Sequence, residues 1–269
     1  MEAIKNTSTE NIAKAIRKEL IKMHQKGPHI GPAFSVVDII AVLYFDIMNI
    51  SSPDDPARDR FILSKGHASS VLYTTLAFKG FYDKSLLDGY LTDNSVLFGH
   101  PKRKALPGIE ASTGSLGQGL SLGVGIALAA KNDNEKYKTY VVIGDGECQE
   151  GQIWEAAMLA SKLKLDNLVV VVDANNLQGY DRVENIQPIN TFKAKWEAFG
   201  WSVKETDGHD VNKLKEALQE TPFESGKPSI VIARTMKGKG IAEFEDDLKW
   251  HYFLIPKDKV DSYLEELSR

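Results

Sequence analysis

Two short apolar runs, separated by a stretch with helical character, constrain the fold of this chain more than any other feature. Residues 140–143 and 168–172 are uninterrupted apolar segments of strand length, and residues 149–163 between them are expected to form a helix. Strands that are apolar at every position are buried on both faces, as in a parallel sheet covered by helices. The sequence therefore predicts an α/β fold with a mostly parallel sheet flanked by helices.

Polar residues follow the carboxyl ends of both predicted strands. Asp145 comes after the first strand and Asn175 after the second, and in an α/β sheet such residues face one ligand-binding crevice. With the backbone carbonyl of Leu177 they supply hard oxygen donors suited to Mg²⁺ or Ca²⁺, and Mg²⁺ would keep further positions for diphosphate oxygens and water. Gly146 allows the backbone to approach a phosphate closely at the start of a helix. Taken alone, the same turn is also compatible with ordinary helix capping.

The composition limits the alternatives. A chain of 269 residues, of which 42% are hydrophobic, is long enough for one large domain, which we expect to span residues 1–269. The net charge of −4 gives no electrostatic basis for binding nucleic acid, and the sequence has no apolar run of about 18 residues that would span a membrane. Cys148 is the one cysteine, which excludes an internal disulfide and suits a cytoplasmic protein. We expect it to pack in the core rather than act as a nucleophile.

The spacing around the central turn resembles a known cofactor motif. The sequence GDG at 144–146 is followed by Asn175, thirty positions after Asp145 (175 − 145), as in the metal and cofactor motif of thiamine-diphosphate-dependent enzymes. The flanking sequences GDGECQEG and LKLDNLVVVVDANN resemble the transketolase family in particular. The resemblance implies the thiamin diphosphate-binding fold (a PP domain), with thiamine diphosphate and Mg²⁺ or Ca²⁺ as cofactors. The metal ligands would be Asp145, Asn175 and the carbonyl oxygen of Leu177.

Four histidines stand in segments that resemble the same family. They are His29 in KGPHIGPAFS, His67 in RDRFILSKGHAS, His100 in a GHP sequence, and His251 directly after a tryptophan. Taken singly, His29 would be read as a surface histidine and His67 as part of a capping turn. The resemblance implies instead that His29, His67 and His100 handle protons of substrate hydroxyl groups, and that His67 and His251 bind the diphosphate. A pKa near the operating pH would suit these imidazoles to proton transfer.

The other site residues rest on the resemblance as well. The loop TGSLGQG at 113–119 lies against the cofactor in the family. The implied cofactor-binding residues, besides the two histidines, are Gly114, Leu116, Gly146, Glu147 and Asn175. In the family, the position of Glu150 belongs to a buried acid network that links two cofactor sites, so Glu150 is counted with the catalytic residues.

The helix expected at 116–130 contains an unusual number of small residues. Gly119, Gly123 and Ala127 recur four residues apart, and a glycine inside a helix costs roughly 1 kcal/mol relative to alanine. We infer that this face packs closely against another helix or subunit.

The resemblance covers only the diphosphate-binding half of a transketolase. In the family, a glutamate of a second domain activates the aminopyrimidine of the cofactor, and none of the residues named here replaces it. This implies the N-terminal subunit of a split transketolase, active with a separate polypeptide that carries the pyrimidine-binding and C-terminal domains. The assembly would be α₂β₂ or contain a homodimer of this chain. It would transfer a two-carbon ketol unit from a ketose or ketose phosphate donor to an aldose acceptor.

One segment departs from the family pattern. Transketolases usually continue after the last histidine with glycine and a loop of small residues, whereas residues 252–256 here are YFLIP. The departure leaves two alternatives open: acyl transfer from a 2-oxo acid to a modified sugar with the same cofactor, or a non-catalytic regulatory subunit. The histidines, Asp145 and Asn175 argue against the second alternative, since a subunit without catalysis has no physical need for them.

Overall fold

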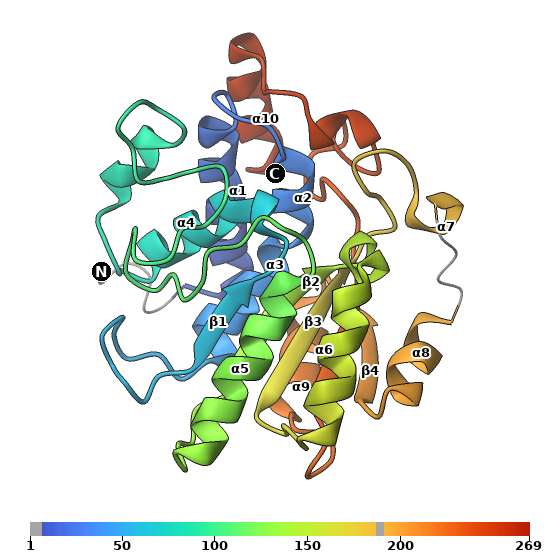
Figure 1. Ribbon diagram of the computed structural model, residues 1–269. Coiled ribbons are helices and arrows are strands. Elements are labelled where there is room, and N and C mark those ends of the chain that lie inside the picture. The colour runs from blue at the N-terminus through green and yellow to red at the C-terminus, as the bar shows by residue number, and fades with distance from the viewer. Residues whose placement is uncertain (1–6, 187–190) are drawn as a thin grey trace.

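A five-stranded sheet forms the centre of the molecule. The computed structural model describes residues 7–186 and 191–269, and in these ranges the strands pair in parallel in the order β1-β2-β3-β5-β4 (Figure 1). The strands are β1 (Arg60–Leu63), β2 (Thr139–Gly144), β3 (Leu168–Ala174), β4 (Ser202–Asp207) and β5 (Ser229–Arg234). The prediction of a mostly parallel sheet is confirmed. The two apolar runs are neighbours in it, since residues 140–143 lie in β2 and residues 168–172 in β3.

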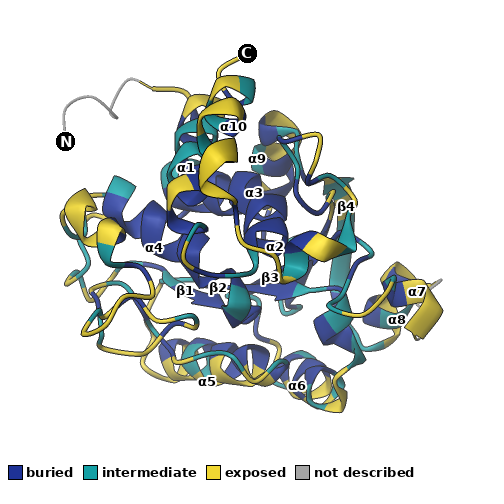
Figure 2. Ribbon diagram, turned by 90° about the horizontal axis from the view of Figure 1, so that it is seen from above, coloured by how far each residue is buried: buried dark blue, intermediate teal, exposed yellow. Residues whose placement is uncertain are grey.

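Helices cover both faces of the sheet (Figure 2). One layer contains α1 (Thr9–Met23), α2 (Ile30–Ser35), α3 (Val37–Val42), α4 (Ser69–Phe78), α9 (Val211–Gln219) and α10 (Val260–Glu266). The opposite layer contains α5 (Gln118–Asn132), α6 (Gly151–Lys162) and α8 (Phe192–Ala198), and the short helix α7 (Val183–Ile186) precedes α8. Within the described ranges, no helix combines the length and the apolar character needed to cross a membrane.

Alternating side chains of the central strands fill the two layers. In β3, Val169 and Val171 belong to the core on the α1 side, whereas Val170 and Val172 belong to the core on the α5 side. Successive side chains of a strand point to opposite faces, so a strand that is apolar at every position serves both cores. This is why the runs carry no alternating pattern in the sequence.

The direction of the chain explains the position of α9. From β1 to β3 the chain moves steadily across the sheet, but β5 lies between β3 and β4, so the connection from β4 to β5 runs backwards. Crossovers between parallel strands are right-handed, which places the helix of a backward connection on the other face. Accordingly, α9 packs in the α1 layer, while α5, α6 and α8 share the opposite layer.

The segment before β1 is helical but is divided into three short pieces. α2 begins at Ile30 and includes Pro32, whose missing N–H falls in the first turn, where N–H groups have no partner within the helix. α3 then ends at Val42, and a π-helical turn, η2 (Leu43–Ile47), follows. Residues 30–43 are all buried, so the sequence has no polar face whose spacing would have revealed these breaks.

The glycines of α5 pack against the sheet, so the inference of another helix or subunit was wrong for this face. A Cβ at Gly119 would lie 2.3 Å from the Oγ of Ser64, and a Cβ at Gly123 would lie 2.4 Å from Cγ2 of Val141. Ser64 directly follows β1 and Val141 is in β2. The small residues therefore let the axis of α5 lie close to both strands.

Candidate active site

A cavity of about 320 Å³ opens at the carboxyl ends of the central strands. Its lining includes all the residues predicted for the site except Glu150, namely His29, His67, His100, Gly114, Leu116, Asp145, Gly146, Glu147, Asn175, Leu177 and His251. Lys65, Lys237 and Tyr252 also line it and were not predicted. The strand register brings these groups together, because Gly144 is paired with Asp173 and Ala174 with Arg234, so the residues that follow them emerge at one edge.

Asp145 is a buried carboxylate whose charge is only partly compensated. Its Oδ1 accepts a hydrogen bond from the N–H of Gly146 at 2.8 Å, and its Oδ2 accepts one from the N–H of Asn176. Burial and then the carboxylate of Asp173 raise the pKa of Asp145 from 3.8 to about 6. A divalent cation beside Asp145 would offset this charge.

Asn175 is held so that its amide oxygen faces away from the neighbouring acid. Its Nδ2 donates to Oδ2 of Asp173 at 3.2 Å and to Oγ of Ser35 at 3.3 Å, and its Oδ1 accepts from the N–H of Leu177 at 2.9 Å. The described residues contain no group of three or more His, Cys, Asp or Glu side chains placed to hold a metal. One carboxylate, one amide oxygen and one backbone carbonyl fit a cation such as Mg²⁺, which takes its other ligands from diphosphate oxygens and water.

A buried ion pair that no local sequence pattern indicates supports this arrangement. Nζ of Lys65 is paired with Oδ2 of Asp173, and both side chains are almost wholly buried. Ser35 donates to the same carboxylate at 2.6 Å, and Thr235 donates to its other oxygen. Burial alone would raise the pKa of Asp173, but the Lys65 ammonium and these donors hold it below its ordinary value. Asp173 therefore stays ionised and keeps the Asn175 amide in one orientation.

Three of the predicted histidines form a cluster of rings. The ring centroid of His29 lies 5.5 Å from that of His67 and 5.2 Å from that of His251, and the rings of His67 and His251 are stacked at 5.4 Å. His29 has a left-handed backbone with φ of 76°, and its N–H donates to the carbonyl of His251 at 3.0 Å. Strained backbone of this kind is concentrated at functional sites.

The histidines of the cavity are neutral near pH 7, which differs from the expectation that they titrate near the operating pH. Burial, followed by His100 and Lys237, lowers the pKa of His29 to about 4. Burial and then Lys237 lower the pKa of His251 to about 3. The pKa values of His67 and His100 are also lowered by burial. A neutral imidazole offers one N–H donor and one acceptor to a sugar hydroxyl.

Two glycines bring the 113–119 loop against the histidines. Gly114 has φ of 144°, and a Cβ there would lie 3.1 Å from Cδ2 of His100. A Cβ at Gly66, next to His67, would lie 2.8 Å from the N atom of Gly114. The loop and the turn after β1 therefore need glycine for their close contact.

The two predicted glutamates lie in different surroundings. Glu147 is buried, and its Oε1 accepts hydrogen bonds from the hydroxyl of Ser64 and from the N–H of Gly117, the latter at 2.7 Å. Its Oε2 accepts from the N–H of Gly144 at 3.1 Å, so Glu147 ties three segments of the cavity wall together. Glu150 is exposed at the N-terminus of α6, outside the cavity. Its role in a buried acid network stays a prediction for the assembled enzyme.

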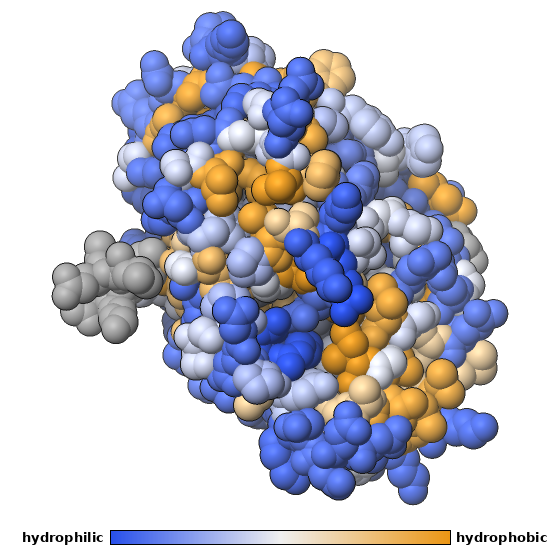
Figure 3. All heavy atoms as spheres, turned by 60° about the vertical axis from the view of Figure 1, so that its left-hand side comes forward, coloured by the Kyte–Doolittle hydropathy of each residue, from blue (hydrophilic) through white to orange (hydrophobic). Residues whose placement is uncertain are grey.

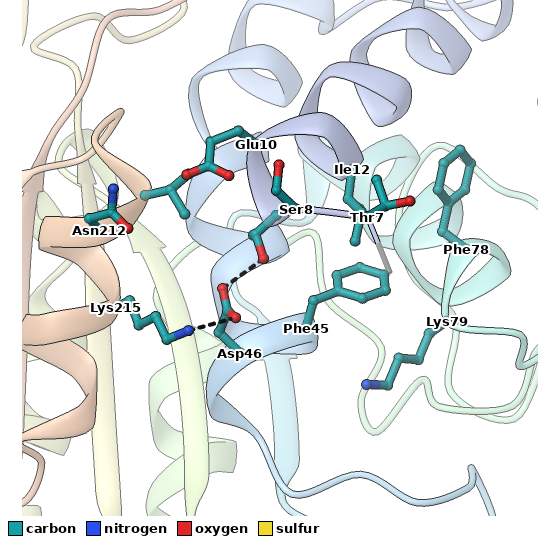
Figure 4. Close-up of a pocket in the computed structure, with 12 residues that line it drawn as sticks. Thr7, Ser8, Glu10, Ile12, Phe45, Asp46, Phe78, Lys79, Asn212 and Lys215 are labelled. Carbon is teal, nitrogen blue, oxygen red and sulfur yellow. Dashed lines mark hydrogen bonds and ion pairs between the residues drawn. The ribbon is translucent and has the colours of Figure 1, made fainter. Parts of the chain in front are cut away.

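A larger cavity, of about 600 Å³, lies elsewhere, between the beginning of α1, η2 and α9 (Figure 4). Its central acid, Asp46, accepts a hydrogen bond from Thr9 at 2.7 Å and pairs with Lys215 at 3.0 Å. None of the residues predicted for the site lines it. Asp46 and Lys215 neutralise each other there, and the predicted residues gather in the other cavity, so we place the active site at the strand ends.

Comparisons with known proteins identify a family for this chain. Residues 7–267 match the family described as transketolase, thiamine diphosphate binding domain. The chain is 41% identical over 256 residues to one of the subunits of the apulose-4-phosphate transketolase of Phocaeicola vulgatus, and the match covers 94% of this chain and 91% of the relative. It is 39% identical over 243 residues to 6-deoxy-6-sulfo-D-fructose transketolase subunit SqwG of a Clostridium species, covering 90% of this chain and 88% of the relative.

A solved structure shares the fold. The transketolase from Leishmania mexicana superposes with a TM-score of 0.89 at 30% identity, covering 98% of this chain and 42% of that one. The chain thus spans less than half of the solved transketolase but most of each relative that is named as a subunit. The resemblance inferred from the GDG motif and the histidine segments is confirmed, and the chain belongs to the transketolase family, in which it corresponds to the thiamine diphosphate-binding domain.

Proposed function

We propose that this chain is the diphosphate-binding subunit of a thiamine-diphosphate-dependent transketolase, which transfers a two-carbon ketol unit from a ketose phosphate to an aldose. The proposal rests on one observation: the oxygen donors Asp145, Asn175 and Leu177 line the same cavity as a cluster of neutral histidines. The family membership and the relatives named as transketolase subunits support ketol transfer over acyl transfer from a 2-oxo acid and over a non-catalytic role.

Different residues of the cavity would bind the cofactor and the sugar substrate. Asp145, Asn175 and the carbonyl of Leu177 would hold Mg²⁺ or Ca²⁺. Gly146, His67 and His251 would bind the diphosphate, and Lys237 would add a charge-assisted hydrogen bond to it. When bound, thiamine diphosphate supplies the electron sink for cleaving and forming a carbon–carbon bond next to a carbonyl. His29, His67 and His100 would orient the sugar and exchange protons with its hydroxyl groups, each imidazole acting as donor on one nitrogen and acceptor on the other.

A partner subunit would complete the site. Large apolar side chains are exposed at and beside the cavity mouth, among them Tyr180, which is 84% exposed, and Phe253, which is 59% exposed. Figure 3 shows a face of the molecule on which apolar patches lie among strongly hydrophilic groups. Contiguous exposed apolar surface marks interaction sites. The proposed assembly is an α₂β₂ enzyme of the cytoplasm, in which a separate chain contributes the pyrimidine-binding domain.

Calorimetry tests this proposal. Thiamine diphosphate with Mg²⁺ is titrated into the chain alone and into a one-to-one mixture with the partner identified by co-purification. We expect tight binding only in the mixture, and none in a mixture that contains Asp145→Ala. Equally tight binding to the isolated chain would contradict a site shared between chains, and unchanged affinity of the variant would contradict the metal assignment. The loaded mixture is then assayed for ketol transfer and for CO₂ release from pyruvate, since CO₂ release would favour the acyl-transfer alternative.

A further inference from the structure

Tyr252 occupies a position in the cavity that the metal and diphosphate assignments leave without a role. Its ring centroid lies 4.7 Å from that of His251 and 6.3 Å from that of His29. The residue lines the cavity, yet 52% of its surface is exposed. It therefore forms part of the wall beside the histidines and is also open to solvent.

The position of the Tyr252 phenol depends on a glycine across the cavity mouth. A Cβ on Gly179 would lie 2.4 Å from the hydroxyl oxygen of Tyr252 and 3.5 Å from Nε2 of His251. Gly179 itself lines the cavity. The aromatic ring thus extends from the histidine cluster to the 178–180 segment, and its hydroxyl fits there only because residue 179 has no side chain.

The chemistry of this side chain suits a carbohydrate. A phenol ring is a rigid amphipathic surface that packs against carbon atoms, and its hydroxyl both donates and accepts hydrogen bonds. Among the described residues, none forms a hydrogen bond with the Tyr252 hydroxyl, so this group is available to a ligand. Phe253 and Leu254 follow in the chain and are also exposed, but neither lines the cavity. An apolar contact with the partner subunit would therefore involve these two residues rather than Tyr252.

We infer that Tyr252 is a specificity-determining residue, which limits the length of the sugar chain beyond the reacting carbons and binds one of its hydroxyl groups. The inference rests on the proposed function. At this position the phenol excludes a long or bulky sugar from the region between His29 and the 178–180 segment. A shorter sugar would meet the ring face and the phenol hydroxyl instead.

The test uses the enzyme assembled with its partner subunit. The variants are Tyr252→Gly, which removes the wall, Tyr252→Phe, which removes only the hydroxyl, and Phe253→Ala as the matched control outside the cavity. The measured quantity is the ratio of kcat/KM values for a seven-carbon and a five-carbon 2-ketose phosphate donor with one aldose acceptor. Each variant is also checked for folding by thermal melting and for cofactor affinity by calorimetry.

The expected results follow from the space and the hydrogen bond that each change removes. Tyr252→Gly should shift the ratio by about tenfold towards the seven-carbon donor, a typical effect of pocket size on specificity. Tyr252→Phe should lower kcat/KM for the five-carbon donor by roughly tenfold, the effect of one lost hydrogen bond. Phe253→Ala should leave the ratio unchanged.

A further variant tests the contact between the two sides of the mouth. Gly179→Ala should displace the phenol and shift the donor ratio in the same direction as Tyr252→Gly. In a Tyr252→Gly background, Gly179→Ala should cause no further shift, because the clashing hydroxyl is gone. Each donor ratio compares two kcat/KM values of one enzyme preparation, so the correctly folded fraction of that preparation cancels. The comparison therefore remains valid if one variant folds poorly.

Two outcomes separate the inference from the function on which it rests. If the loaded wild-type assembly transfers no ketol unit from any donor, the proposed function and this inference both fail. If the wild type is active and Tyr252→Gly leaves the donor ratio unchanged, or Phe253→Ala shifts it equally, the proposed function stands and the role of Tyr252 is wrong.

Discussion

Nζ of Lys237 lies 2.8 Å from Nδ1 of His251, which joins two groups of the cavity that come from separate segments of the chain. The same ammonium donates to the carbonyl of Gln178 at 2.9 Å and to the carbonyl of Leu177, a predicted metal ligand, at 3.3 Å. Burial and then the charge of Lys65 lower the pKa of Lys237 from 10.5 to about 7. Lys237 is therefore a cation that links the metal position with the diphosphate position and titrates near neutrality.

The titration of Lys237 predicts a pH-dependent affinity for diphosphate. A bound anion raises the pKa of this ammonium, so its contribution to binding is complete below about pH 7 and is lost as the pH rises through the raised value. A charge-assisted hydrogen bond contributes about 2 kcal/mol, roughly 30-fold in Kd. At pH 6, metal-free Lys237→Met should therefore bind inorganic pyrophosphate roughly 30-fold more weakly than metal-free wild type. The difference should shrink towards pH 9. Lys239→Met, a neighbour outside the cavity, should behave as wild type, and parallel curves for Lys237→Met and wild type would contradict the assignment.

The predicted metal ligand Asp145 should destabilise the metal-free chain at neutral pH. Its pKa is raised from 3.8 to about 6, so the folded state binds the proton more tightly than the unfolded state. The free energy of unfolding therefore falls as the pH rises from about 4 through 6. At about 1.4 kcal/mol per pH unit, the total loss relative to pH values below 4 is about 3 kcal/mol. Urea unfolding at pH 7.5 should therefore show Asp145→Asn to be more stable than the wild type, with the difference vanishing near pH 4. Mg²⁺ should stabilise only the wild type.

Asp173, on the neighbouring strand, should stabilise the folded chain, in contrast to Asp145. Its pKa is held below the ordinary value by Lys65 and hydroxyl donors, and Asp173→Asn would leave the Lys65 ammonium buried without its partner. Breaking a buried pair in this way costs about 3–5 kcal/mol. The same unfolding experiment should show a less stable protein, and an unchanged or higher free energy of unfolding would contradict the ion pair.

The parts of the fold that the sequence predicted are those in which a local pattern has one physical meaning. An apolar run such as 168–172 is buried on both faces, and the polar residue at its carboxyl end must emerge at the sheet edge. The sequence alone did not predict that Lys65, Asp173 and Lys237 would be buried in the site, because charged residues are normally exposed. Their burial depends on segments that meet only in the folded chain. A usable signal was available, since all three lie in or near the carboxyl end of a strand.

Cys148 should be unreactive in the folded protein. Its side chain is buried, its thiol donates to the carbonyl of Gly144 at 3.4 Å, and burial, followed by Glu147 and Asp145, raises its pKa well above the ordinary value. Because the thiolate is the nucleophile, iodoacetamide at pH 8 should alkylate native protein far more slowly than urea-unfolded protein. Comparable rates in the two states would contradict the packing role that the sequence predicted.

The close approach of α5 to the sheet can be tested with two glycines of the same helix. A Cβ at Gly123 would lie 2.4 Å from Cγ2 of Val141, a fully buried β-branched side chain that cannot move aside, whereas a Cβ at Gly125 would have no atom within 4 Å. Gly123→Ala should therefore destabilise the chain by about 1–3 kcal/mol through overpacking. Gly125→Ala should stabilise it by up to about 1 kcal/mol, because alanine is the better helix former. Chemical unfolding of the two variants measures both effects against one wild type. Equal changes in the free energy of unfolding at the two positions would contradict the close contact between Gly123 and Val141. Destabilisation by Gly125→Ala alone would mean that the opposite face of α5 packs against the sheet.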